Sequence, residues 1–297
     1  MSPFYQEKNL AYYREYFQCT AEDASFCVAG KRPVLAFLMD APTARMGQYG
    51  GQPTAVVFRE DATEAEAIEA WKIAQNYLQK NFAEVEFQFE EINSETLSGF
   101  TQWLLNKGQS PGVLFRQHLN LEQSEESLLA KCRKIYRANI RKGQEALSVR
   151  LINHDTIETG DIEAFRQLHI RVAGKETRSK MSWSLQEEMI RQSEAFALYG
   201  YLNNELVAAG LFPHTRYRCY YGVGAYDRTL FDQPLSHGLV WSAVMQAKKQ
   251  GCQWFDLGDI FFSHMVKADG TLPTEKELTI SHFKSGFGGA LVSVLRF

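Results

Sequence analysis

The chain has 297 residues, of which 45% are hydrophobic and 13% aromatic, and a formal net charge of −3. This length suits two domains of about 150 residues each, and the composition excludes a disordered or fibrous protein. A net charge so close to zero gives no general attraction to nucleic acid or to an anionic membrane. A polyanion would therefore have to bind at a local basic patch, and no DNA partner is expected.

The sequence has no pattern typical of a secreted or membrane-inserted protein. Its first residues lack a basic region followed by an apolar run, and no apolar run reaches the roughly 18 residues that a membrane helix needs. We therefore expect a cytoplasmic protein without membrane insertion. The cysteines are odd in number and form no CxxC pair, which predicts reduced thiols. The histidines lack metal-ligand spacing, so neither a metal nor a resident cofactor is expected.

The first half alternates strands and helices. Residues 25–29 and 34–39 are predicted strands, and the Gly30-Lys31-Arg32-Pro33 segment between them predicts a hairpin. Thr63 is followed three residues later by Glu66, a capping box that opens a helix running to about residue 80. Further elements are expected as strands at 54–58, 84–90 and 112–119 and a helix at 95–106.

A basic helix is predicted over residues 124–141, with Gly143 as its stop signal. Lys134, Arg137 and Arg141 fall on one stripe of this helix, at positions i, i+3 and i+7. The stripe is a candidate site for the phosphates of a tRNA backbone or of another anionic donor. The alternative is a solvated helix face whose charges pair with neighbouring glutamates.

The second half is also mixed. Strands are expected at 147–152, 195–202, 205–212, 217–223 and 253–257, and helices at 161–172, 184–192 and 234–249. The predicted fold class is therefore α/β with a mixed sheet. A polar loop at 174–180 contains Lys175 and Arg178, which are candidates for binding an anionic acceptor. A solvated loop is the alternative.

Four segments of the second half together resemble the FemAB family. They are Tyr220-Tyr221-Gly222-Val223-Gly224-Ala225, the helix segment 239–243, Gly251-Cys252-Gln253-Trp254-Phe255-Asp256-Leu257-Gly258, and Phe283-Lys284-Ser285-Gly286-Phe287-Gly288-Gly289. The resemblance extends over about residues 128–297, and the last segment is its most specific part. It implies two tandem domains similar to GNAT acyltransferases, which we place at residues 1–145 and 146–297.

The resemblance also implies a reaction. FemAB proteins transfer an aminoacyl group from tRNA to a peptidoglycan precursor, and their relatives acylate other amino groups. By this resemblance Lys284 lies near the donor, where its charge would stabilise negative charge developing during transfer. Gly286 and Gly288 would let the backbone approach the donor. The alternative for this segment is a glycine turn before a last strand.

Amide formation requires a deprotonated amine, so a general base is expected near the acceptor. Asp259, at the end of a predicted strand, and His237, near the start of a predicted helix, are the catalytic candidates; a structural role for His237 is the alternative. Tyr221 and Asp227 are assigned to acceptor binding.

The sequence leaves two classes of acyl donor open. Ordinary GNAT enzymes share a glycine-containing loop that binds the CoA pyrophosphate at a helix N-terminus. Here Gly222-Val223-Gly224-Ala225 is followed by a segment with two acids, which departs from that pattern. We therefore expect an aminoacyl-tRNA type of donor and, as acceptor, an amino group of a cell-wall, sugar or peptide molecule. The alternatives are an acyl-CoA or acyl-carrier-protein donor, and a non-catalytic module that binds an anionic ligand.

Overall fold

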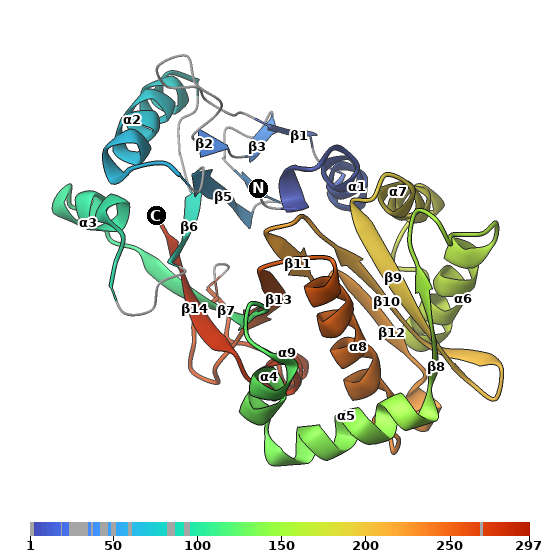
Figure 1. The fold of residues 1–297 in the computed structure, drawn as a ribbon. Helices are drawn as coiled ribbons and strands as arrows, with labels where there is room; N and C mark the ends of the chain where they lie inside the picture. Colours follow the sequence, from blue (N-terminus) through green and yellow to red (C-terminus); the bar gives the residue numbers. More distant parts are fainter. Residues whose placement is uncertain are drawn as a thin grey trace.

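The computed structural model describes residues 3–18, 20–23, 35–36, 38–41, 47–48, 52–58, 61–81, 87–91, 96–267 and 270–297. Within these ranges the chain forms two main sheets covered by helices (Figure 1). The predicted strand at 25–29 and the turn at 30–33 lie outside the described residues. None of the described helices is both long and apolar enough to cross a membrane.

The first sheet is antiparallel and has the order β12-β10-β9-β8. Helix α8 (Leu235–Lys249) covers one face, and α6 (Asp161–Ala173) and α7 (Lys180–Arg191) cover the other (Figure 1). The strands are β8 (Ser148–Ile152), β9 (Ala195–Leu202), β10 (Glu205–Pro213) and β12 (Val223–Tyr226). Because both faces of the two central strands are buried, β9 and β10 have continuous apolar sequences instead of an alternating pattern.

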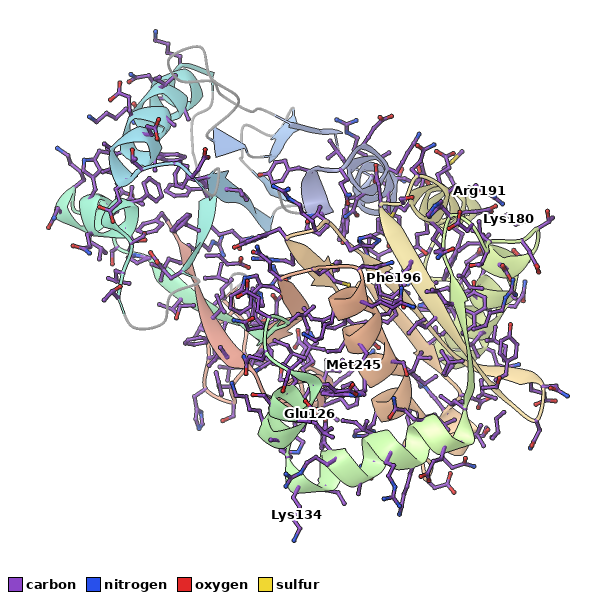
Figure 2. All side chains as sticks on the ribbon, viewed as in Figure 1. Glu126, Lys134, Lys180, Arg191, Phe196 and Met245 are labelled. Atoms are coloured by element: carbon purple, nitrogen blue, oxygen red, sulfur yellow. The ribbon has the colours of Figure 1, made fainter. Side chains whose placement is uncertain are left out.

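Strand β9 shows how the two faces are divided. Phe196 and Leu198 belong to the apolar cluster that contains α8, whereas Ala197 and Tyr199 belong to the cluster with α6 and α7. Successive side chains of a strand point to opposite faces, so one strand contributes to both cores. Figure 2 shows Phe196 in the interior near α8.

The second sheet has the order β11-β13-β7-β14-β6-β5-β2, with β4 also paired to β5. Its strands are β2 (Leu35–Ala36), β4 (Gly47–Gln48), β5 (Gln52–Phe58), β6 (Phe87–Glu91), β7 (Gly112–Asn120), β11 (Arg218–Tyr220), β13 (Trp254–Ile260) and β14 (Ala290–Arg296). A separate pair joins β1 (Thr20–Asp23) and β3 (Leu38–Ala41). Strand β14 lies between β6 and β7, antiparallel to both, so strands from both sides of residue 145 share this sheet. The domain boundary at residue 145 stays a prediction.

The remaining helices are η1 (Pro3–Tyr5), α1 (Glu7–Phe17), α2 (Glu64–Asn81), α3 (Gly99–Asn106), α4 (Glu125–Lys131), α5 (Lys134–Ala146), η2 (Arg228–Leu230) and α9 (Glu275–Ser285). The predicted capping box at the start of α2 is confirmed. The Glu66 backbone N–H donates to Thr63 Oγ1 at 3.2 Å, and the Thr63 N–H donates to the Glu66 carboxylate at 2.9 Å.

The single helix predicted over 124–141 is wrong, because the chain forms α4 and α5 with a break at Cys132 and Arg133. Both residues have extended backbone angles. The Arg133 backbone N–H donates to the Gly286 carbonyl at 3.0 Å, and its guanidinium donates to Ser285 Oγ at 2.7 Å. These contacts with the end of α9 replace the helical hydrogen bonds. Gly143 does not stop α5, which continues to Ala146.

Helices α5 and α8 approach each other at two glycines. A Cβ atom on Gly238 would lie 2.5 Å from the carbonyl carbon of Gly143, and a Cβ atom on Gly143 would meet the carbonyl oxygen of Pro234. Side chains do not fit at either position. Helix α5 therefore packs directly across the first turn of α8.

We expect Gly238→Ala to destabilise the protein by about 1–3 kcal/mol, because the new methyl group overpacks this crossing. Helix propensity alone would favour the same substitution by about 1 kcal/mol, so the sign of the effect tests the packing. Urea unfolding gives the free energy. Gly112→Ala is the control, since its Cβ would meet no atom within 4 Å; a Gly238→Ala protein as stable as wild type would contradict the close approach.

The two sheets separate where the chain passes from β11 to β12. The Tyr221 backbone N–H donates to the Asp256 carbonyl in the second sheet at 2.9 Å, and the next N–H, of Gly222, donates to the Leu211 carbonyl in the first sheet at 3.1 Å. The strand predicted at 217–223 is therefore two short strands in different sheets. This divergence leaves an opening between β10 and β13.

Candidate functional site

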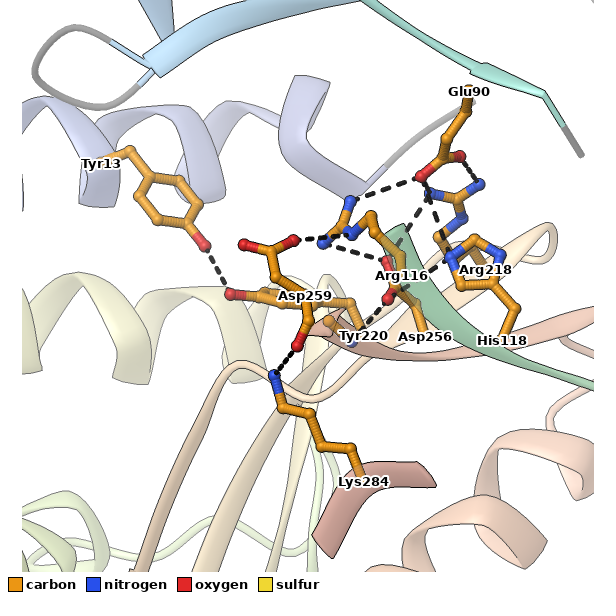
Figure 3. Close-up of polar contacts among 10 residues, drawn as sticks. Tyr13, Glu90, Arg116, His118, Arg218, Tyr220, Asp256, Asp259 and Lys284 are labelled. Atoms are coloured by element: carbon orange, nitrogen blue, oxygen red, sulfur yellow. Dashed lines mark hydrogen bonds and ion pairs between the residues drawn. The ribbon is translucent and has the colours of Figure 1, made fainter. Parts of the chain in front are cut away.

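A cavity of about 220 Å³ lies where the two sheets diverge. Helix α1 contributes one wall, and β7, β10, β13 and the crossover at Tyr220 and Gly222 contribute others. The Glu194 carboxylate holds the start of α1 by accepting the backbone N–H groups of Lys8 and Asn9, at 3.0 and 3.1 Å. The hydroxyls of Tyr13 and Tyr220 lie 3.2 Å apart across the boundary (Figure 3).

A β-bulge in β13 brings Asp256 and Asp259 to the same side of the second sheet. Asp256 pairs with His118 of β7, and Asp259 pairs with Arg116, so two residues of β13, Leu257 and Gly258, oppose the single residue Gln117 of β7. The extra residue is accommodated at Gly258, whose φ of +86° favours glycine. Without the bulge, Asp259 would point to the opposite face.

A cluster of charged side chains lies beside Asp259 (Figure 3). Arg116 approaches three carboxylates, with N···O distances of 3.2 Å to Asp256, 3.4 Å to Glu90 and 3.4 Å to Asp259. Arg218 makes a bidentate contact with Glu90, donating from Nη1 to Oε1 at 3.0 Å and from Nη2 to Oε2. The network therefore fixes the Arg116 side chain beside Asp259.

The network keeps its carboxylates ionised. Burial by itself would raise the pKa of Glu90, but the charge of Arg218, with His118 and Arg116, lowers it to about 2. For Asp256, burial is likewise outweighed by Arg116, and the pKa lies well below its usual range. Glu90, His118 and Asp256 offer one ligand atom each within 4.8 Å of one another. However, two guanidinium groups already supply the positive charge that a metal ion would bring, so we assign these groups to an ion-pair network.

Lys284 lies in the last turn of α9 and reaches the same place. Its ammonium donates to the backbone carbonyl of Asp259 at 3.1 Å (Figure 3). Burial lowers the pKa of Lys284, and the nearby charges of Asp259 and Asp256 partly oppose this shift. The structure thus brings together two of the predicted catalytic residues, Lys284 and Asp259, from separate motifs.

Arg178 lines the same cavity, between α6 and α7. Its Nε donates to the Tyr12 hydroxyl at 3.1 Å, and its guanidinium carbon lies 5.0 Å from the centre of the Tyr16 ring. Lys175, in the same loop, is exposed and does not belong to the cavity lining.

His237 is placed among aromatic rings, away from the cavity lining. Its ring centre lies 4.5 Å from that of Tyr136, 5.2 Å from Phe283 and 6.1 Å from Phe287. Burial lowers the pKa of His237 to about 4, so the imidazole is neutral near pH 7. This environment is that of a packing residue between α5, α8 and α9.

The remaining acceptor-binding candidates have local partners. The hydroxyls of Tyr221 and Tyr226 lie 2.8 Å apart, and burial raises the pKa of Tyr221 to about 12. The Asp227 carboxylate caps η2 by accepting the Thr229 backbone N–H at 3.0 Å. Neither Tyr221 nor Asp227 belongs to the cavity lining.

The donor-binding candidates lie outside the cavity lining, at two other places in the fold. Gly286 packs against the Tyr136 ring, and a Cβ atom on Gly288 would meet the backbone of Lys131, so both glycines are required by packing. The basic stripe is exposed on α5, and Figure 2 shows Lys134 projecting from the outer side of this helix. The stripe consists of Lys134, Arg137 and Arg141. Arg141 also pairs with Glu145 at 3.2 Å.

Sequence reasoning missed Glu90, Arg116, Arg218 and the tyrosines of α1. One signal was present, because Arg116 and His118 occupy alternate positions of a strand and must share a face. The partners of these residues come from three other strands, and their pairing depends on strand order.

No family model matches the chain, and no curated protein matches it in sequence. Solved structures do match it in fold. FemX covers 98% of this chain and 91% of its own, with a TM-score of 0.67 and 11% identity. The C-terminal domain of a protein described as a lysylphosphatidylglycerol synthetase from Agrobacterium fabrum covers 96% and 85%, with a TM-score of 0.61 and 10% identity. L-PGS from Bacillus licheniformis covers 98% and 91%, with a TM-score of 0.55 and 14% identity.

These likenesses show the class of fold alone, an α/β fold of the GNAT type. More particularly, the arrangement is FemAB-like, since FemX matches along almost the whole chain. The predicted fold class, a mixed α/β structure with two tandem GNAT-like domains, is therefore confirmed.

Proposed function

We propose that this protein is an N-acyltransferase that moves an aminoacyl or acyl group onto an amino group. One observation carries the proposal: the Lys284 ammonium donates to the backbone carbonyl of Asp259, whose carboxylate lines the cavity and pairs with Arg116. A cation bound to the backbone of the residue that carries an exposed carboxylate suits the two charges that amide formation creates.

The residues have distinct roles in this proposal. Asp259 binds the acceptor ammonium and takes its proton, so that the neutral amine attacks the acyl carbonyl carbon. A C–N bond forms as the bond to the donor oxygen breaks; the nitrogen gives its second proton to the leaving oxygen, which becomes a hydroxyl, and Asp259 releases the first proton to solvent. Lys284 stabilises the negative charge on the carbonyl oxygen or the leaving oxygen. Arg116, held by Glu90 and Asp256, keeps the Asp259 carboxylate in place.

We propose an aminoacyl-tRNA type of donor, which acts as a co-substrate in a site without a resident cofactor. Two observations support this choice. Helix α5 packs on the first turn of α8, the position where ordinary GNAT enzymes bind the CoA pyrophosphate. The exposed stripe of α5 offers phosphate-binding charges instead. Two proteins of similar fold also carry the name lysylphosphatidylglycerol synthetase or its abbreviation, and that name describes an aminoacyl product.

The test is a transfer assay with two donors. Purified protein is incubated with bulk tRNA charged with radiolabelled amino acids, or with radiolabelled acetyl-CoA. The acceptors are L-lysine, glucosamine and a lysine-containing peptide, which represent the proposed amino groups. We expect a base-stable labelled amide from charged tRNA. Transfer from acetyl-CoA alone would overturn the proposed donor, and transfer from neither donor would overturn the proposed activity.

A further inference from the structure

We propose that the cavity beside α1 binds the acceptor as a zwitterion, with Arg178 receiving a carboxylate and Asp259 receiving the amine. The inference rests on the proposed function and names its acceptor class, a small group that carries both an amine and a carboxylate.

The first step concerns the charge of Arg178. Its contacts are with neutral groups: the Tyr12 hydroxyl at 3.1 Å, His169 Nε2 at 2.8 Å, and the Tyr16 ring. Burial and the Arg178 charge lower the pKa of His169 to about 4, so this imidazole is neutral near pH 7. Among the described residues, no carboxylate forms an ion pair with Arg178. A planar guanidinium whose protein contacts are all neutral is suited to binding the carboxylate of a ligand.

The second step concerns Asp259, the acidic residue in the cavity lining. Its side chain is 62% exposed, whereas that of Asp256 is fully buried. Asp259 shares Arg116 with two other carboxylates, so its charge is not fully compensated by that contact. The cavity thus presents a carboxylate from β13 and a guanidinium from the loop before α7, a charge pattern complementary to a zwitterion.

The third step concerns buried amides in the same lining. Gln186 is completely buried beside Tyr12, yet neither polar atom of its amide is within hydrogen-bonding geometry of a partner. Asn9 is 1% exposed, and its Oδ1 likewise lacks a partner. Unsatisfied polar atoms in a buried position are unfavourable, and a polar ligand in the cavity would supply the missing hydrogen bonds if either amide turned towards it.

The size of the cavity limits the ligand. A volume of about 220 Å³ corresponds to roughly seven water molecules, and it is below the range of pockets that hold drug-sized molecules. The aromatic rings of α1 and Tyr220 form its walls. A free amino acid fits this description, and so does the last residue of a peptide whose side chain ends in an amine.

Matched pairs of ligands test the carboxylate contact. Calorimetric titration compares L-serine with ethanolamine, L-alanine with ethylamine, and L-lysine with cadaverine, because each pair differs only by the carboxylate. We expect at least one amino acid to bind wild type tenfold or more tightly than its amine, and Arg178→Gln to abolish that difference. Arg191→Gln is the control, since Arg191 lies in a surface pair with Glu187 on α7.

The proposal is overturned if amino acids and amines bind equally, if neither binds, or if Arg191→Gln has the same effect as Arg178→Gln. Asp259→Asn is expected to weaken both members of each pair, because the amine contact is common to them. Unchanged amine binding in this variant would contradict the role of Asp259.

A second arm separates the two sources of the ligand. Acetyl-Ala-Ala-Lys is compared with its C-terminal amide, and tenfold preference for the free carboxylate would identify a peptide end as an acceptor. Binding of the free amino acid alone would identify the small molecule. The titrations contain no donor, so binding without transfer would reject the proposed function and keep this inference. Transfer to amines that does not depend on Arg178 would keep the proposed function and reject this inference.

Discussion

Replacing Lys284 with methionine is expected to reduce the turnover number for acyl transfer by about 10²–10³, with a smaller change in KM for the acceptor. The substitution keeps an unbranched apolar side chain that is one atom shorter and removes the ammonium that donates to the Asp259 backbone carbonyl. The variant therefore loses stabilisation of the charged transition state. Steady-state kinetics with charged tRNA measure both constants.

Lys276→Met is the matched control, because Lys276 is exposed on the same helix. Burial lowers the pKa of Lys284, so its ammonium is lost at a lower pH than that of an ordinary lysine. Activity should accordingly fall as the pH rises towards the usual lysine value of about 10.4, and Lys284→Arg should remove this fall. If Lys284→Met were as active as Lys276→Met, the proposed role of the motif would be wrong.

Replacing Arg218 with methionine is expected to destabilise the protein by about 3–5 kcal/mol, because it leaves the largely buried Glu90 carboxylate without its bidentate partner. Urea unfolding of wild type and variant gives the difference. Arg191→Met, on the surface of α7, should change the free energy of unfolding by less than about 0.5 kcal/mol. Adding Glu90→Gln to Arg218→Met should restore part of the loss, since the unpaired charge is then gone. Additive effects would show that the two groups are not coupled.

The network also makes stability depend on acid pH. Carboxyls whose pKa is lowered by folding contribute stability above their unfolded pKa of about 4, and that stability disappears as the pH falls through the folded value. The folded pKa of Glu90 is about 2, and that of Asp256 lies well below its usual range. The unfolding free energy of wild type should therefore decrease from about pH 5 to pH 2, with a shallower slope in Glu90→Gln.

Local pattern predicted most elements of this fold because it reflects burial along one segment. The apolar runs of β9 and β10 and the capping box of α2 are local signals, and each predicted its element. The break between α4 and α5 was not predictable in this way, since it arises from contacts of Arg133 with residues about 150 positions later. Helix α9 was also missed, although Thr274 and Glu277 form a capping box at its start.

The arrangement of the candidate site also could not be predicted from local sequence patterns. Resemblance pointed to Lys284 and a strand-end argument to Asp259, but neither predicted that a bulge at Gly258 would place them together. Glu90 and Arg218 are 128 residues apart. A charged residue in a predicted strand has the same local pattern whether it faces solvent or a buried partner. Only the order of strands in the sheet distinguishes the two.

The position of β14 has a consequence for how the protein is made. A ribosome releases β6 and β7 long before β14, and Gln117 of β7 bonds to the Gly288 carbonyl, 171 residues later. Until then β6 and β7 lack their shared neighbour and expose two strand edges, which favour pairing with other chains. The second sheet is therefore completed only late in synthesis. Nascent chains are expected to rely on chaperones, and deletion of residues 290–297 should yield aggregates instead of a shortened folded protein.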